Sequence, residues 1–402
     1  MLYDYIIVGG GIVGISTAWQ LLKREPGKKI LLLEKEPTFA SHQTGHNSGV
    51  IHAGVYYSPG SLKATFCKAG VDATISFCRE NDLPYLQCGK LIVATNPSEV
   101  ERMHALFARA QENGIDVTLQ NESQLKAREP NISGMEAIFV KSTAIVNYQQ
   151  VAIKMAEHFS DLGGEAKLNH EVIDLKEEET FIAVSAKLGR DNIRFKTKFL
   201  ITCSGLMADR TTQMLGIPTD FRVIPFRGIY YRLPQKYNDI VRHLIYPVPD
   251  PDYPFLGVHL TRMIDGSVTV GPNAVLSLKR EGYGKVNIDL QDLYDMASFK
   301  GFWKIARDNL AFGITEAKNS LWKRGYLKTV QKYCPQLELA DLLPYPAGIR
   351  AQTVSRDGKL INDFLFAQSD RSLHVCNAPS PAATSSIPIG RYICDKVLEK
   401  VS

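Results

Sequence analysis

The feature that most constrains this chain is a glycine-rich turn placed between a strand and a helix near its start. The run YIIV, residues 5–8, predicts a short buried strand. Gly9, Gly11 and Gly14 follow it with the spacing G-x-G-x-x-G, and a helical apolar pattern begins at Ile12. Such glycines allow a tight turn, close approach of the backbone to a pyrophosphate, and close packing of the helix on the strand.

A second apolar run, residues 30–33, ends at Glu34. A carboxylate at this place can accept hydrogen bonds from both ribose hydroxyls of an adenosine, and it would repel a 2′-phosphate. The free N–H groups at the start of the helix attract the phosphates. Strand, glycine turn, helix, strand and acidic residue in this order predict an α/β nucleotide-binding fold. The alternative is a glycine-rich turn that binds nothing.

The sequence changes in character after Glu34, because no charged residue occurs from Pro37 to Leu62. The segment HQTGHNSGVIHAGVYY, residues 42–57, holds three histidines and three glycines. Short polar groups and glycines let backbone N–H groups approach a second phosphate and a flat ring system. This composition favours FAD over NAD, whose enzymes usually continue through further strand–helix units.

The alternative is a metal site, because the three histidines His42, His46 and His52 could act as ligands. Their spacings of four and six residues lie in a loop broken by glycines, and carboxylate ligands are absent nearby. We therefore expect no metal, and expect the segment to line a cofactor pocket.

Size and composition limit the class of protein. The 402 residues, the net charge of +5 and the lack of like-charge blocks predict a large α/β body or two domains and no nucleic-acid partner. Seven cysteines without a C-x-x-C pair favour reduced thiols. The chain shows no signal-peptide pattern and no apolar run near the ~18 residues of a membrane span, so we expect a cytoplasmic protein, at most peripheral on the inner face of the cell membrane.

The glycine turn, Glu34 and the segment HQTGHNSGVIHAGVYYSPGSLKATFC resemble the N-terminal region of the L-2-hydroxyglutarate dehydrogenase/oxidase family, within the glycine oxidase/D-amino acid oxidase superfamily. The resemblance implies a FAD-dependent enzyme acting on a CH–OH donor. It would oxidise L-2-hydroxyglutarate to 2-oxoglutarate by hydride transfer to flavin N5, with electrons passed to a membrane quinone or to oxygen. The alternative is an oxidase of an amino acid or another 2-hydroxy acid. Further similar motifs span nearly the whole chain, at 203–210, 225–228, 245–251, 255–275, 348–364 and 377–390.

The resemblance also implies a D-amino acid oxidase-like α/β fold, in which a Rossmann-type FAD-binding domain of interleaved segments carries an inserted α+β substrate domain. The pattern of predicted elements agrees with this layout. We expect the FAD-binding domain to comprise 1–85, 146–220 and 346–402, and the substrate domain to comprise 86–145 and 221–345.

Two local patterns predict helices in the rest of the chain. Ser98 and Glu101 form a possible capping box that begins a helix, and Gly114 would end it. The run FKGFWKIARDNL, residues 299–310, has aromatic and basic residues at helical spacing. It predicts a helix that packs on the core with a solvated basic side, or alternatively one that contacts an anionic membrane where quinone would be met.

Residues from all three FAD-binding segments are expected to hold the cofactor. His46, in the motif HNSG, resembles the histidine that bonds FAD covalently in dimethylglycine and sarcosine dehydrogenases, although a hydrogen bond to FAD is the main expectation. Ser380-Pro381 or Ser386-x-Pro388 can begin the last helix, which the resemblance places at the flavin, where its N-terminus would stabilise the anionic reduced form. Besides Gly9, Gly11, Gly14 and Glu34, the expected contacts are Lys35, Thr44, His46, Asn47, Ser48, Gly49, Val172, Ser204, Gly205, Gly348, Ser380, Ala382, Ala383 and Thr384.

Oxidising a 2-hydroxy acid requires a cation for the carboxylate, a base for the hydroxyl proton and an acceptor for the hydride. Arg350, in GIRAQTVSRDG, is the best candidate for the cation, because the arginine fork matches a carboxylate and the superfamily's substrate arginine lies in a similar motif. The alternative is a structural ion pair. Arg227 and Arg262 are weaker candidates for the distal carboxylate, and a structural role is the main expectation for each.

Two histidines compete for the role of general base. His259 lies in a strand pattern where apolar residues alternate with it, and imidazole titrates near working pH. A buried histidine with no catalytic role is the alternative. His52 is the rival, because its segment resembles the flavin-facing loop of glycerol-3-phosphate dehydrogenases. Tyr57 could then donate a hydrogen bond to the substrate or cover the flavin ring.

Overall fold

The first sheet of the protein is built around its N-terminal strand, as the sequence predicts. The computed structural model describes residues 1–250, 257–284, 287–308 and 323–401. In it, β1 (Leu2–Val8) pairs in parallel with β2 (Ile30–Leu33) and with β12 (Asp191–Thr202). The sheet runs in the order β10-β11-β12-β1-β2-β9, and β20 adds to β12. The other strands are β9 (Glu165–Lys167), β10 (Glu171–Glu177), β11 (Ile182–Leu188), β19 (Leu365–Gln368) and β20 (Ser372–Asn377).

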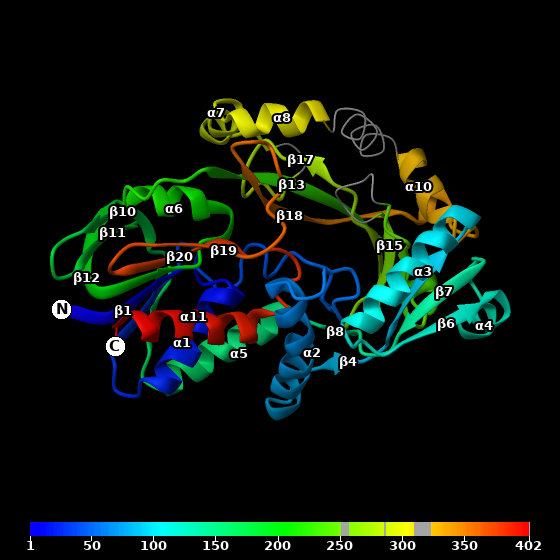
Figure 1. The fold of residues 1–402 in the computed structure, drawn as a ribbon, viewed down its shortest axis with the longest axis horizontal. Coiled ribbons are helices and arrows are strands. Elements are labelled where there is room, and N and C mark those ends of the chain that lie inside the picture. Colours follow the sequence, from blue (N-terminus) through cyan, green and yellow to red (C-terminus); the bar gives the residue numbers. More distant parts are fainter. Residues whose placement is uncertain (251–256, 285–286, 309–322, 402) are drawn as a thin grey trace.

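The two faces of this sheet are covered differently. Successive side chains of a strand point to opposite faces. Tyr5 and Ile7 of β1 belong to a core shared with four helices, while Ile6 and Val8 pack in a cluster with apolar side chains of β10, β11 and β12. Besides α2 (Leu62–Glu80), the helices are α1 (Ile12–Arg24), α5 (Tyr148–Asp161) and α11 (Ser386–Val401), and these three lie together below the sheet in Figure 1.

Close contacts fix helix α1 against the glycine turn and against the last helix, α11. A Cβ atom on Gly14 would lie 2.0 Å from the carbonyl oxygen of Gly9, so the helix can approach the turn only with glycine there. A Cβ on Gly390 of α11 would lie 2.4 Å from Nε2 of Gln20. The same Gln20 nitrogen donates to the carbonyl of Ile387, so the first and last helices are joined.

The second large sheet runs in the order β17-β13-β16-β15-β14-β5-β7-β6. Its longest pairing joins β13 (Phe221–Arg232) to β18 (Leu343–Ser355), in antiparallel register from Phe221 to Arg232. β18 therefore crosses the expected domain boundary at residue 346, and the division into domains stays a prediction. The remaining strands are β5 (Lys90–Ala94), β6 (Val117–Asn121), β7 (Glu136–Val140), β14 (Leu244–Pro247), β15 (His259–Arg262), β16 (Val268–Gly271) and β17 (Val275–Leu276).

A small sheet of β3 (Val50–Ile51), β8 (Ala144–Val146) and β4 (Tyr85–Leu86) lies between the two large ones (Figure 1). No helix in the described ranges is long and apolar enough to span a membrane. The other helices are α3 (Pro97–Glu112), α4 (Glu122–Arg128), α6 (Ala208–Met214), α7 (Leu290–Ala297), α8 (Lys300–Asp308) and α10 (Lys323–Gln331), with short 3₁₀ turns η1 (Gly205–Met207), η2 (Gln235–Tyr237) and η3 (Leu339–Asp341).

The predicted cap of α3 is wrong. Asn96, not Ser98, caps this helix, because its side-chain oxygen accepts a hydrogen bond from the backbone N–H of Glu99 at 3.0 Å. Pro97 occupies the first turn, where its missing N–H costs nothing. The predicted helix at 299–310 is confirmed from Lys300 to Asp308, and the last two residues of that run lie outside the described residues.

Candidate active site

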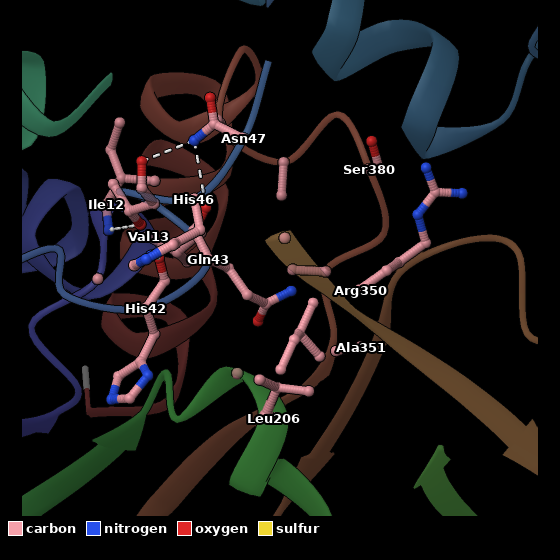
Figure 2. Close-up of a pocket in the computed structure, with 18 of the residues that line it drawn as sticks. Ile12, Val13, His42, Gln43, His46, Asn47, Leu206, Arg350, Ala351 and Ser380 are labelled. Atoms are coloured by element: carbon pink, nitrogen blue, oxygen red, sulfur yellow. Dashed lines mark hydrogen bonds between the residues drawn. The ribbon is translucent and has the colours of Figure 1, made fainter. Parts of the chain in front are cut away.

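A cavity of about 730 Å³ extends from the glycine turn after β1 to the second large sheet. Gly9 and Glu34 line one part of it, and Tyr246 and His259 of the second sheet line another. Figure 2 shows the start of α1 with His42 on one side of the view, and Arg350 with Ser380 on the other. The cavity therefore joins the predicted nucleotide site to the predicted substrate site.

The glycine turn forms one wall of the cavity. Gly9 has φ +113, and a Cβ there would lie 2.4 Å from the carbonyl oxygen of Cys203, which follows β12. The N–H of Gly9 donates to the carbonyl of Leu33, and the N–H of Cys203 donates to that of Val8. The ends of three parallel strands thus fix a bare backbone beside the cavity, which suits close approach of a phosphate.

Glu34 lies at the end of β2 with only 8% of its surface exposed. Its carboxylate accepts hydrogen bonds from the backbone N–H of Gly10 at 2.5 Å and from that of Glu36 at 2.8 Å. An ionised carboxylate has about four acceptor positions, so these two bonds orient the group and leave capacity for ribose hydroxyls.

Replacing Glu34 by alanine should lower the molar ratio of FAD to purified protein, because the acceptors for the ribose are lost. The ratio is measured from the visible flavin absorbance after gel filtration. Glu165→Ala, at the edge strand β9 of the same sheet and outside the cavity lining, is the matched control. Unchanged occupancy in the Glu34 variant would remove the ribose role.

Hydrogen bonds within the neutral segment shape the next part of the wall. Thr44 Oγ1 accepts from the backbone N–H of Ile12 at 3.1 Å, at the first turn of α1. Asn47 Nδ2 donates to the carbonyls of Gln43 and Thr44 (Figure 2), and Asn47 Oδ1 accepts from the N–H of Gly49. These uncharged groups bond to one another and to the turn, so neutral hydrogen bonds hold this part of the loop.

The three histidines of the segment face different partners. Nε2 of His42 lies 2.8 Å from Oε1 of Glu36 and 3.6 Å from Oε1 of Glu281, and Lys35 pairs with both acids. The ring of His46 stacks on Tyr283 with ring centres 4.0 Å apart. His52 lies further along the cavity wall, toward the second sheet.

His52 faces the part of the cavity that also contains His259. The rings of His52 and Tyr246 meet edge-on with centres 6.4 Å apart, and Tyr246 stacks on His259 at 3.9 Å. The backbone of His52 is held on both sides, since its N–H donates to Thr384 Oγ1 and its carbonyl accepts from Cys67 Sγ. Burial, with the charges of nearby basic groups, holds the pKa of His52 well below its usual value.

His259 is buried in β15 with a defined tautomer. Its Nδ1 lies 3.0 Å from the carbonyl oxygen of Gly257. A carbonyl can only accept, so Nδ1 carries the proton and the neutral ring keeps a lone pair on Nε2. Burial chiefly, with the charges of Lys90 and Arg350, lowers the pKa of His259 to about 3, so the ring is neutral at physiological pH.

Two cationic side chains line the cavity near these histidines. Arg350 lies on β18 opposite Phe226 of β13, and its side chain is open to the cavity. Lys63, in the first turn of α2, has its ammonium 4.6 Å from the centre of the Tyr57 ring. Burial and the nearby Arg350 lower the pKa of Lys63 to about 8.

Three residues at this part of the site, Lys63, Lys90 and Tyr246, are not predicted from the sequence. For Lys63 a signal was present, because it is the first charged residue after the neutral segment. The weaker candidates Arg227 and Arg262 are not among the residues that line the cavity in the described part of the chain.

The structure brings nearly all the other predicted site residues to this cavity, and their roles stay predictions. Gly14 and Gly49 do not line it: Gly14 packs on Gly9, and a Cβ on Gly49 would lie 2.6 Å from the carbonyl of Val146. The lining includes Gly9, Gly11, Glu34, Lys35, Thr44, His46, Asn47, Ser48, His52, Tyr57, Val172, Ser204, Gly205, His259, Gly348, Arg350, Ser380, Ala382, Ala383 and Thr384.

The residues present fit FAD. The bare turn at Gly9 leaves room for phosphates, and Glu34 offers acceptors for a ribose. Gly348, where a Cβ would lie 2.8 Å from the carbonyl of His46, and the strip 378–384 line the cavity further along with mostly small side chains, which leaves room for a ring system. Glycine turn, acidic strand end and a long cavity toward a second sheet define a flavin-dependent oxidoreductase.

Comparison with known proteins identifies the family. The family model described as FAD dependent oxidoreductase matches residues 4–396. The chain is 55% identical to the L-2-hydroxyglutarate dehydrogenase of Escherichia coli (strain K12) over 396 residues, which cover 98% of this chain and 93% of that protein. It is 41% identical to the human mitochondrial L-2-hydroxyglutarate dehydrogenase over 99% of this chain and 89% of that one. The chain belongs to the L-2-hydroxyglutarate dehydrogenase family of FAD-dependent oxidoreductases.

Solved structures confirm the fold. The FAD-bound L-alpha-glycerophosphate oxidase from Mycoplasma pneumoniae superposes with a TM-score of 0.81 at 21% identity, over 99% of this chain and 95% of that one. The glycine oxidase from Geobacillus kaustophilus superposes with a TM-score of 0.72 at 15% identity, over 99% and 95% of the two chains. The predicted D-amino acid oxidase-like α/β fold and the FAD dependence are therefore confirmed.

Proposed function

We propose that this enzyme oxidises the CH–OH group of L-2-hydroxyglutarate to give 2-oxoglutarate. The observation that carries the proposal is a group of basic side chains at one part of the cavity. Arg350, Lys63, His52 and His259 line it, and Lys90 lies behind the rings of Tyr56 and Tyr246. Lys63 and Lys90 form no ion pair with a carboxylate in the described part of the chain. A substrate with two carboxylates would supply negative charge to these two lysines. The names of the relatives agree with this substrate.

The two cations on the cavity wall would hold the two carboxylates. Arg350 would bind the carboxylate next to the reacting carbon, because its planar fork gives two parallel hydrogen bonds and fixes the orientation of that carbon. Lys63 would bind the distal carboxylate, since a lysine is a point charge that tolerates more than one approach. Tyr57, whose ring lies beside the Lys63 ammonium, would cover the substrate on that side.

FAD, when bound, supplies at its N5 atom an acceptor for the hydride that leaves the substrate Cα. The chain would hold it through the glycine turn, Glu34, the segment 42–49 and the strip 378–384, all of which contribute to the cavity wall. His46, stacked on Tyr283, would contact it by a hydrogen bond.

His259 would take the hydroxyl proton. Its Nε2 has the lone pair, because Nδ1–H is engaged by the Gly257 carbonyl. The two substrate carboxylates add negative charge near the ring, which raises its pKa from the low value of the free site toward working pH. The O–H proton moves to Nε2, the Cα–H electron pair leaves as hydride, and the C–O bond becomes a carbonyl. His52 is the second candidate for this base.

The electrons would then pass to a membrane quinone or to oxygen. The solvent side of α8 supports a peripheral membrane contact, because Trp303 is 59% exposed near Lys300 and Lys304. Measuring quinone reduction against oxygen consumption during turnover separates the two acceptors.

The experiment that tests the function is anaerobic reduction of the enzyme-bound flavin. L-2-hydroxyglutarate should bleach the visible absorbance, and the D isomer should do so at least about tenfold more slowly because the Cα–H bond then points away from the acceptor. A panel of amino acids and other 2-hydroxy acids is run in parallel. Bleaching by an amino acid and not by L-2-hydroxyglutarate would overturn the proposal.

A further inference from the structure

Lys90 is a buried cation next to the proposed substrate site. It begins β5, is 1% exposed, and is among the largest fully buried side chains of the protein. Its strand neighbours are the apolar residues Val140 and Leu244. Among the residues that the structure describes, no carboxylate lies within ion-pair distance of its ammonium.

Aromatic rings take the place of a counter-ion. The Lys90 ammonium lies 4.5 Å from the centre of the Tyr56 ring and 5.0 Å from that of Tyr246. Cation–π contacts offset only part of the cost of burying a charge. Burial accordingly lowers the pKa of Lys90 to about 7, so near neutral pH the side chain is divided between its charged and neutral forms.

Both rings connect Lys90 to the cavity, whose wall they form. The Lys90 ammonium donates to Tyr56 Oη at 3.4 Å. When Tyr56 accepts this bond, its own O–H proton is directed elsewhere and can be donated to an anion in the cavity. Tyr246 lies between Lys90 and His259, because its ring contacts the lysine ammonium and stacks on the histidine.

We propose that Lys90 is a positioning residue which takes up a proton when the dicarboxylate binds, and which then directs the Tyr56 hydroxyl toward the distal carboxylate. The titratable groups that face it are Cys67 of α2, Tyr56 and His52 of the neutral segment, Tyr246 of β14 and His259 of β15. None of them is an acid that is ionised near neutral pH, so the ligand is the source of the negative charge. This inference rests on the proposed function.

The direct test is proton uptake by the holoenzyme when 2-oxoglutarate is added anaerobically in weak buffer with a pH indicator. At about pH 7 the wild type should take up roughly half a proton per site, because Lys90 is about half protonated there and becomes fully charged in the complex. Lys90→Met should take up less than about a fifth of that. Lys63→Met, measured at a 2-oxoglutarate concentration raised to saturate its weaker binding, should keep most of it, since Lys63 is already largely charged at this pH.

Kinetics give an independent readout. In the wild type, KM for L-2-hydroxyglutarate should rise above about pH 7 by up to tenfold per pH unit, because binding then requires a proton. Lys90→Met should raise KM at about pH 6 at least tenfold, lose this dependence and keep kcat within about threefold. Lys90→Arg, which stays charged, should keep a low KM to about pH 8, above which Lys63 in turn loses its proton. Tyr56→Phe should raise KM with little change in kcat.

The outcomes separate this inference from the proposed function. If L-2-hydroxyglutarate does not reduce the wild-type flavin, the proposed function fails. If it does, but the wild type takes up no proton at neutral pH or Lys90→Met takes up as much, Lys90 does not have this role. Absence of uptake in the wild type rejects this role even if the methionine variant fails to fold. If uptake occurs, Lys90→Arg can replace that variant, because an arginine is already charged at neutral pH and should take up less than about a fifth as much. Because the charged lysine is costly to bury, the methionine variant should instead unfold at an equal or higher temperature without ligand.

Discussion

Replacing Arg350 by alanine is expected to reduce the rate of anaerobic flavin reduction by L-2-hydroxyglutarate at least about a hundredfold, mainly through lost substrate binding. Removing one partner of a desolvated, hydrogen-bonded charge pair costs about 2–5 kcal/mol. The side chain lies on β18 within the cavity, and the charge of Arg350 affects the pKa values of His52, Lys63 and His259. Its loss therefore removes both the fork that orients the carboxylate and part of the positive potential.

Two further variants test whether the effect is specific to the guanidinium of Arg350. Arg350→Lys keeps the charge without the planar fork, and should recover binding only in part. Arg356→Ala is the matched control, because Arg356 lies in the same motif but is exposed and outside the cavity lining. FAD-to-protein ratios are measured for all three. Near-normal reduction by the Arg350→Ala enzyme, with full flavin occupancy, would reject the assignment.

The second large effect is expected at His259. Removing a general base typically costs about 10²- to 10⁴-fold in rate, so His259→Ala should slow flavin reduction at saturating substrate while leaving FAD bound. His52→Ala should slow it less. The comparison is made by stopped-flow absorbance, with the exposed His104→Ala on α3 as the control. The opposite order would make His52 the base, and no slowing in either variant would reject both.

The low pKa of His259 also predicts how the stability of the protein changes with pH. The folded pKa is about 3, below the ordinary value of 6.5, so the unfolded chain binds more protons between these values. The contribution of His259 to the free energy of unfolding is therefore complete above pH ~6.5 and is lost as the pH falls toward ~3. We expect the loss of stability between about pH 6.5 and pH 5 to be smaller in His259→Ala than in the wild type.

The sequence predicts the nucleotide-binding part of the fold well, because the patterns that indicate it involve residues close together in the chain. A G-x-G-x-x-G turn after a strand determines its own geometry, and β1, α1 and β2 lie where it indicates. The error at α3 is also local: Asn96 and Ser98 are both good caps, and only the bond from Glu99 N–H separates them.

The substrate part was less predictable because it depends on distant pairings. His259 and Arg350 reach one cavity only through the β14–β15 and β13–β18 pairings. Lys90 stands at the beginning of the run KLIVA, where a lysine normally marks an exposed strand end. Its burial depends on the pairing of β5 with β14 and on rings contributed by Tyr56 and Tyr246, and no short pattern indicates these.

The packing of the first helix, α1, against the last, α11, has a consequence for biosynthesis. β20 adds to β12 beside β1, and α11 packs on α1, so residues 372–401 complete the layer that supports the glycine turn. During translation the ribosome releases the glycine turn hundreds of residues before it releases residues 372–401. Flavin loading is thus expected to follow translation rather than accompany it. A prematurely terminated polypeptide would expose an unpaired edge of β12, retain no flavin and be recognised by cellular quality control.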